Sequence, residues 1–193
     1  GTMANQTAIK LHTQPGDKLI CDKYAHVYNY EGGGAAFNSG VTCKLIDGHR
    51  GMFTAEQLQS AVAGRNDIHV PYSRLVCIEN TTNNTISICL SKGLGAPIGS
   101  ILVGSKEHIA KALRIRKLFG GAMRQVGFLA AAGMYALDNH VERLAEDHKK
   151  AKEIGAVLES LSYVTKVEPI ETNIVIFYVD DKVGDINFIN KMK

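Results

Sequence analysis

The strongest constraint on the fold is the alternation of short apolar runs with segments of helical spacing. Residues 3–13 have helical spacing, and Thr54 with Gln57 forms a capping-box pattern that starts another helix, through Ala63. Strands that alternate with helices are typical of α/β layering, so we expect an α/β fold. The apolar runs of strand length are residues 18–21, 41–46, 74–79, 85–90 and 98–103.

The second half of the chain is dominated by helical spacing. Residues 106–118 predict a helix, which the Gly120-Gly121 pair ends. Residues 127–161 keep apolar positions at helical intervals over many turns, with a predicted break into two helices at residues 138–140. Residues 172–179 predict a buried strand.

The charge balance argues against a nucleic-acid partner. Lys and Arg number 22 against 19 Asp and Glu, which gives a net charge of only +3. The densest basic run, residues 111–117, fits the solvated face of a helix better than a nucleic-acid site. Tryptophan is absent, and the Tyr and Phe residues are not interleaved with Arg as stacking platforms would be.

The cysteines favour a reducing compartment over a metal or redox site. None of the four cysteines belongs to a C-x-x-C pair or to a histidine cluster. Cys77 and Cys89 lie inside apolar runs, where a free thiol acts as a small buried apolar side chain. No signal peptide and no apolar run of membrane-spanning length occurs in the 193 residues. We therefore expect a cytoplasmic protein with no membrane partner and no bound metal.

The stretch with the most chemical information is Ser-Ile-Cys-Leu-Ser-Lys-Gly-Leu-Gly-Ala-Pro-Ile-Gly-Ser at residues 87–100. Its lysine, Lys92, lies where an apolar strand emerges, directly before a Gly-rich turn. Partial desolvation favours the neutral amine, which attacks a carbonyl to form a Schiff base. The glycines let the backbone pass close to a flat cofactor. A solvated lysine before an ordinary Gly-Pro turn explains the same spacing, so both interpretations remain open on spacing alone.

Taken whole, this stretch closely resembles the cofactor-lysine segment of the threonine aldolases, in the aspartate-aminotransferase-like group of pyridoxal-phosphate (PLP) enzymes. Other segments resemble that family in the same order, and together they cover essentially the whole chain. They are Gly-Thr-Met-Ala-Asn-Gln at 1–6, Asp-Lys-Tyr-Ala-His through Glu-Gly-Gly-Gly at 22–34, Glu-Asn-Thr-Thr at 79–82, Arg-Lys-Leu-Phe-Gly-Gly-Ala-Met-Arg-Gln at 116–125 and Thr-Asn-Ile-Val at 172–175.

The resemblance implies a fold and a reaction. The fold is α/β, with a mainly parallel sheet between helices in a large PLP-binding domain, residues 1–142. Residues 143–193 are part of a smaller C-terminal α+β domain. The reaction is the cleavage of L-threonine or L-allo-threonine to glycine and acetaldehyde through the Cα–Cβ bond. Relatives build their sites at subunit interfaces, so a homo-oligomer, a dimer or a tetramer, is expected; this rests on fold analogy.

The resemblance also assigns roles to particular residues. Gly1 and Thr2 are expected to bind the PLP phosphate at a helix N-terminus, where free N–H groups and a partial positive charge favour anions. His26 is expected to stack on the cofactor ring and to accept a proton during catalysis. Lys92 is expected to hold the cofactor. Lys117 and Arg124 are expected to bind the substrate carboxylate or another subunit, and a helix-end ion pair is the competing interpretation for them.

Glu31, beside the glycine run, is expected to pair with a basic group. Thr82 stands where many relatives have a histidine that handles the substrate hydroxyl. A threonine hydroxyl can form a hydrogen bond but cannot act as a base near neutral pH. The identity of the proton acceptor and the preference between threonine and allo-threonine therefore remain open.

The chain departs from its relatives in the segments that it lacks. A region before Gly1, a C-terminal region and an internal segment near residues 83–84 are expected to be missing. The internal segment carries the family's Asp-Gly-Ala-Arg motif, whose aspartate pairs with the pyridine nitrogen. Its absence here would join two buried strands with no room for the crossover that parallel strands need.

Two alternatives to threonine cleavage remain. One is another PLP lyase, which eliminates at the β-carbon or cleaves a bulkier substrate such as phenylserine. The other is a catalytically decayed homologue that acts as a structural subunit, which the missing aspartate favours.

Overall fold

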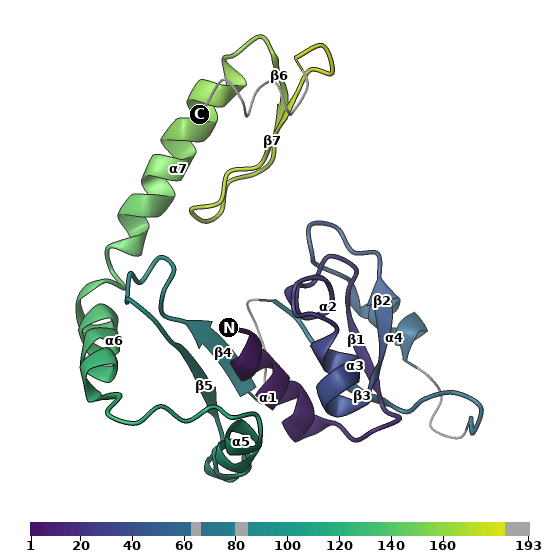
Figure 1. The fold of residues 1–193 in the computed structure, drawn as a ribbon. Helices are drawn as coiled ribbons and strands as arrows, with labels where there is room; N and C mark the ends of the chain where they lie inside the picture. The colour runs from purple at the N-terminus through teal and green to yellow at the C-terminus, as the bar shows by residue number, and fades with distance from the viewer. Residues whose placement is uncertain (63–66, 80–84, 184–193) are drawn as a thin grey trace. The chain divides into compact units, whose positions relative to one another are not determined.

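The computed structural model describes residues 1–62, 67–79 and 85–183 (Figure 1). They form two compact units. The first unit comprises Gly1–Lys92 with Pro97–Ala130, and the second comprises Gly93–Ala96 with Ala131–Lys193. The division falls inside a helix, at Ala130, and the domain boundary expected after residue 142 stays a prediction. Within the described ranges, no helix is long and apolar enough to cross a membrane.

The centre of the first unit is a three-stranded parallel sheet. Strands β1 (Lys18–Asp22), β2 (Thr42–Ile46) and β3 (Ser73–Val76) lie in the order β2-β1-β3. Leu19 is in register with Cys43 on one side and with Leu75 on the other. The expectation of an α/β fold with a parallel sheet is confirmed.

Two helices of this half, α1 (Thr2–His12) and α4 (Ala55–Ala61), begin close to where the sequence predicts, whereas α2 (His26–Asn29) and α3 (Gly34–Ser39) were not predicted. Helix α1 precedes the sheet, α2 and α3 connect β1 to β2, and α4 follows β2. The capping box at α4 is present: Gln57 N donates to Thr54 Oγ1 at 3.3 Å, and Thr54 N donates to Gln57 Oε1 at 2.9 Å.

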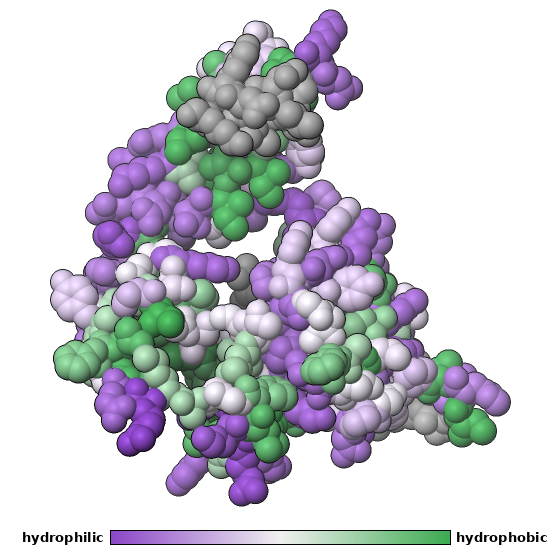
Figure 2. Space-filling model, viewed as in Figure 1, coloured by the Kyte–Doolittle hydropathy of each residue, from purple (hydrophilic) through white to green (hydrophobic). Residues whose placement is uncertain are grey.

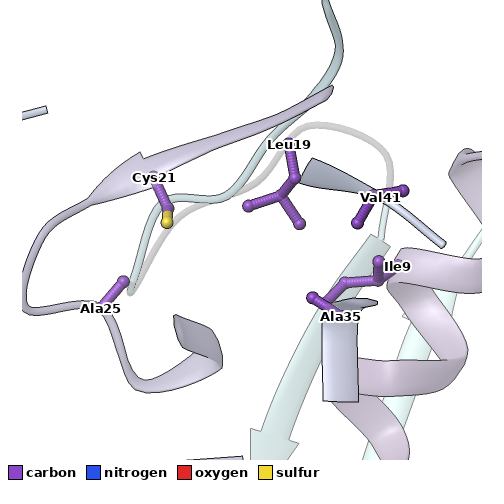
Figure 3. Packing of buried hydrophobic residues seen from close by; sticks show 6 residues of the cluster. All are labelled: Ile9, Leu19, Cys21, Ala25, Ala35 and Val41. Carbon is purple, nitrogen blue, oxygen red and sulfur yellow. The ribbon is translucent and has the colours of Figure 1, made fainter. Parts of the chain in front are cut away.

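Two small cores lie on opposite faces of β1. Because side chains alternate along a strand, Leu19 and Cys21 point to one face and Ile20 to the other. Figure 3 shows the first core, in which Leu19 meets Ile9 of α1 and Ala35 of α3. On the other face, Ile20 packs with Ile46 and Ala61. Helices therefore cover both faces of β1, as in a doubly wound sheet.

The predicted strands that flank Lys92 form an antiparallel pair in a second sheet. Strand β4 (Thr85–Cys89) pairs with β5 (Ser100–Gly104), and helix α5 (Lys106–Leu118) follows. Strands β3 and β4 belong to different sheets, and the expectation that residues 85–90 form a buried strand is wrong, because 45% of Ile86 in β4 is exposed.

The second unit contains helix α7 (Leu144–Glu159) and an antiparallel pair, β6 (Val164–Val167) with β7 (Phe177–Val179). Helix α6 (Gly127–Asn139) ends at the predicted break. The predicted strand over 172–179 is too long, because Thr172 Oγ1 accepts a hydrogen bond from Ile174 N at 3.3 Å and forms a local turn instead. Strand β6 was not predicted, since its Val-Thr-Lys-Val sequence gains its conformation from pairing with β7.

Candidate active site

The N-terminus of α1 opens onto a cavity of about 740 Å3 in the first unit. Gly1 is the N-cap residue, no side chain caps the helix, and its first turn holds no acidic residue. Gly1, Ser91, Ser100 and Arg116 line the cavity together with apolar side chains of α1, β5 and α5. Gly1 N donates to Ser100 Oγ at 2.5 Å. Hydroxyl groups, an arginine and uncapped helix N–H groups form a donor set that suits an anion.

The Gly120-Gly121 pair explains how α5 approaches α1. A Cβ on Gly121 would lie 2.1 Å from Met3 Sδ and 2.9 Å from Arg116 Cγ, so a larger residue would force these side chains to move. The contact holds the end of α5 against the first turn of α1. It therefore brings Arg116 to the cavity, a residue to which the sequence analysis assigned no role although it starts the matched block.

The predicted substrate residues lie in the same block but do not line the cavity. Lys117 is in the last turn of α5, and Arg124 is in the turn that precedes α6; both are exposed. Gln125, next to Arg124, has a positive φ of 50°, which is uncommon for a residue other than glycine. Such backbone strain is frequent at binding sites, and the roles of Lys117 and Arg124 stay predictions.

His26 lies at the point where the strand order reverses. The chain leaves β1 toward β2 on one side and returns to β3 on the other, so the carboxyl ends of β1 and β3 flank a switch point. Ligands of open α/β sheets bind at this position. His26, the first residue of α2 after β1, donates its backbone N–H to Glu79, which follows β3. The two strand ends are thus joined at the predicted cofactor histidine.

Glu31 accepts three hydrogen bonds at the same place. Its Oε1 lies 3.0 Å from His26 Nδ1 and accepts from Asn5 Nδ2 at 2.6 Å, and its Oε2 accepts from Gln6 Nε2 at 2.6 Å. The Glu31 side chain is fully buried, whereas 49% of the His26 side chain is exposed. Gly34 makes room for Gln6, because a Cβ there would lie 2.7 Å from Gln6 Cδ. A basic partner was expected for Glu31 from the sequence, and that partner is His26.

Lys92 lies in the connection between β4 and β5, one residue after Ser91, and is exposed. Within the described residues it makes no hydrogen bond or ion pair. Ser91 lines the same cavity as Gly1, so the lysine segment and the N-terminus of α1 are neighbours. Among the described residues, no hydrogen bond or ion pair connects Lys92 with His26. The roles predicted for Gly1, Thr2, His26 and Lys92 stay predictions.

The cysteines divide between the two sheets. Burial raises the pKa of Cys21 and of Cys77 to about 12, as expected for thiols in a core. A hydrogen bond with Ser91 lowers the pKa of Cys89, whose Sγ lies 3.4 Å from Ser91 Oγ. The expectation that Cys89 is simply a buried apolar residue is wrong, because it ends β4 beside the cavity.

Comparison with known proteins identifies the family. The beta-eliminating lyase family matches residues 1–86 and 84–182, so this chain belongs to it. The chain is 32% identical to a probable low-specificity L-threonine aldolase of Schizosaccharomyces pombe, over 91% of this chain and 60% of that protein. It is 34% identical to a low-specificity L-threonine aldolase of Escherichia coli (strain K12), over 78% of this chain and 60% of that protein.

A solved structure of Leishmania major threonine aldolase has the same fold. The two structures match with a TM-score of 0.83 at 16% sequence identity, over 99% of this chain and 70% of the Leishmania chain. Beta-eliminating lyases and threonine aldolases are PLP-dependent. The chain spans about 60% of the length of the two aldolase relatives.

The comparisons also locate an internal difference in length. The family match stops and restarts at residues 84–86. The alignment to the Schizosaccharomyces protein has 225 positions although it uses only 91% of a 193-residue chain. The relative therefore carries several tens of residues without a counterpart here. The break agrees with the segment that the sequence analysis expected to be missing near residues 83–84.

Proposed function

We propose that this chain is the cofactor-binding part of a PLP-dependent lyase that cleaves L-threonine and L-allo-threonine to glycine and acetaldehyde. One observation carries the proposal: α1 has an uncapped N-terminus at the cavity beside the lysine segment, and its next turn holds the His26–Glu31 cluster at the switch point. The relatives' names supply the substrate, since both are called low-specificity L-threonine aldolases.

The residues present fit the cofactor. Gly1 and Thr2 would hold its phosphate with the free N–H groups of α1 and the hydroxyls of Ser91 and Ser100. Lys92 would bind its aldehyde carbon. The half-exposed ring of His26 offers a flat face for the pyridine ring. The described residues add no carboxylate of the Asp-Gly-Ala-Arg motif, which in relatives pairs with the pyridine nitrogen.

When bound, PLP supplies an electron sink for the pair left on Cα as the Cα–Cβ bond breaks. The protein's own residues then have to move and hold protons. His26 would take the proton of the β-hydroxyl, whose oxygen becomes the aldehyde oxygen of acetaldehyde. Arg124 or Lys117 would bind the substrate carboxylate, and Cα would receive a proton before glycine leaves. Thr82, which replaces a histidine of many relatives, lies outside the described residues. Because a Thr hydroxyl cannot act as a base near neutral pH, His26 is the base that we propose.

We also propose that the protein is a cytoplasmic homo-oligomer, a dimer or homotetramer, that serves glycine biosynthesis. Two exposed apolar side chains lie close to Arg124 in the chain: 65% of Met123 and 89% of Phe128 are exposed. Figure 2 shows that apolar residues reach the surface in several patches. Such patches favour contact with another subunit, which would bury them and bring Arg124 toward a neighbouring site.

A turnover assay tests the proposal. Purified protein from the complete coding sequence is given PLP and L-threonine, L-allo-threonine, phenylserine or a β-substituted alanine, and the released aldehyde or pyruvate is measured. Release of acetaldehyde and glycine supports the proposal. Faster turnover of phenylserine or of the β-substituted alanine would favour the second candidate, another lyase reaction, which the name of the matched family supports.

Absence of turnover with every substrate would favour a decayed homologue. The matched variants for this assay are Lys92→Ala and Lys106→Ala, which each remove one exposed lysine. Turnover should disappear only in Lys92→Ala. Turnover retained in Lys92→Ala would contradict the role proposed for this lysine.

A further inference from the structure

The hydrogen bonds of Glu31 constrain where the His26 ring carries its proton. A carboxylate only accepts hydrogen bonds, and a neutral imidazole has one donor nitrogen and one acceptor nitrogen. Because His26 Nδ1 lies 3.0 Å from Glu31 Oε1, Nδ1 must be the donor. Nε2 is then the acceptor. Within the described residues, Nε2 has no hydrogen-bond partner, and 49% of the side chain is exposed.

Glu31 itself is held too firmly to turn away from the ring. Its side chain is fully buried, and Asn5 and Gln6 each donate to it at 2.6 Å. A buried carboxylate that lost these donors would be strongly destabilised, so the three groups form one unit. The His26 backbone is fixed separately, through its N–H bond to Glu79.

We propose that Glu31 is a positioning residue that keeps the proton of His26 on Nδ1 and leaves Nε2 as the proton acceptor. This inference rests on the proposed function for its catalytic meaning, and on the contacts alone for its structural part. Asn5 and Gln6 lie one turn after Gly1 and Thr2 on α1. The helix that would bind the cofactor phosphate therefore also fixes the carboxylate that orients the base.

The first measurement is the tautomer of His26 in the unmodified protein. Histidine labelled with 15N is observed by long-range 1H–15N correlation at about pH 8.5, well above the ordinary histidine pKa of about 6.5. The chain has 7 histidines, and the signals that vanish in His26→Gln are those of His26. We expect a protonated Nδ1 and an unprotonated Nε2. A protonated Nε2 with a bare Nδ1 would overturn the proposal without any variant.

The second measurement compares two glutamates that contact the same histidine. Glu31→Gln keeps the size of the side chain but places an amide NH2 among groups that all donate, so His26 should change to a mixture of tautomers. Glu79→Gln alters the bond to the His26 backbone only, so the ring should keep its tautomer. An unchanged tautomer in Glu31→Gln, in a variant whose spectrum shows a native fold, would overturn the proposal. If Glu31→Gln does not fold, the result on the unmodified protein decides.

Kinetics connect the tautomer to catalysis. General base catalysis contributes about 10²–10⁴-fold, so Glu31→Gln should lower kcat by about ten- to a hundredfold with little change in KM. A changed tautomer with unchanged kcat would overturn the role of Glu31 in positioning the base. Failure of the protein to bind PLP would instead remove the proposed function, and the tautomer measurements, made without cofactor, would still distinguish the two failures.

Discussion

The two sheets of the first unit differ in how completely this chain surrounds them. Strand β1 has a parallel neighbour on each side and helices over both faces, and Leu19, Ile20 and Cys21 are fully buried. Among the described residues, strand β4 has one neighbour, β5, and this pair leaves Ile86 of β4 and Val103 of β5 about half exposed. The His26–Glu31 cluster thus packs on a core that this chain completes by itself. Lys92 lies on a hairpin whose exposed apolar side chains further chain or another subunit would have to cover.

The difference between the two sheets indicates which part of the proposed site is preorganised. The Glu31 carboxylate, His26 Nδ1 and the His26 backbone N–H all have hydrogen-bond partners supplied by the chain itself. On the hairpin side, Ser91 and Ser100 line an open cavity, and Lys92 directly follows Ser91 in the chain. The closed region should therefore decide stability, and the open region should respond to ligands and reagents.

The largest expected effect is on the free energy of unfolding. Leu19→Ala should destabilise the protein by about 2–5 kcal/mol, because it removes a fully buried side chain from a packed core. Ile86→Ala, on the open hairpin, should cost less than about 1.5 kcal/mol, since much of its side chain already meets water. Chemical denaturation measures both. Equal losses for the two variants would contradict the distinction between a closed and an open region.

A smaller loss is expected at the glycine that makes room for Gln6. Gly34→Ala places a Cβ 2.7 Å from Gln6 Cδ and should displace the side chain that holds Glu31, at a cost of about 1–3 kcal/mol. Gly127→Ala is the matched control, because a Cβ there would meet no atom within 4 Å. Thermal unfolding followed by circular dichroism compares them. An unchanged thermal stability in Gly34→Ala would mean that the Gln6–Glu31 contact adjusts freely.

A pH-dependent effect is expected where α1 meets the hairpin. His12 Nε2 lies 2.5 Å from Thr85 Oγ1, and the His12 ring packs edge-on against the ring of His108 of α5 at 4.8 Å. Burial, and then the charge of His108, lower the pKa of His12 below its ordinary value of 6.5. The unfolded chain therefore binds the proton more readily, and the stability from this group is present above pH 6.5 and lost as the pH falls below it.

His12→Gln keeps a polar partner for Thr85 and should reduce the loss of stability on acidification. The loss is measured as the difference in denaturation midpoint between about pH 7.5 and pH 5.5, on either side of the ordinary histidine pKa. The same acid sensitivity in His12→Gln would show that His12 is not its source.

The smallest expected effect concerns thiol chemistry and leaves the fold intact. The lowered pKa of Cys89 gives it more thiolate at neutral pH, while the pKa of about 12 keeps Cys21 and Cys77 protonated. Iodoacetamide should therefore label Cys89 first, as measured by peptide mass spectrometry over time, and unfolding in urea should remove the difference. Labelling of Cys21 at the rate of Cys89 in the native protein would contradict the burial of β1.

Local patterns predict most of the closed region. The short apolar run at residues 18–21 predicts β1, and the Thr54–Gln57 capping box marks the start of α4 in the structure. The extent of residues 172–179 could not be predicted this way, because a local turn at Thr172 and pairing with β6 decide it.

The site shows the same limit. The lysine segment and the glycine run stand out as sequence patterns, but the bond between Gln6 and Glu31 joins residues 25 positions apart and follows only from the fold. Arg116 reaches the cavity because Gly121 packs on Met3, a contact that no local pattern encodes.

The central claim is that the open hairpin carries the cofactor lysine. The most direct measurement adds PLP to the purified protein from the complete coding sequence, records the visible spectrum, reduces with borohydride and maps the labelled peptide. We predict a yellow protein with the label on Lys92 and nowhere else. A colourless protein, or a label on another lysine, would contradict the account.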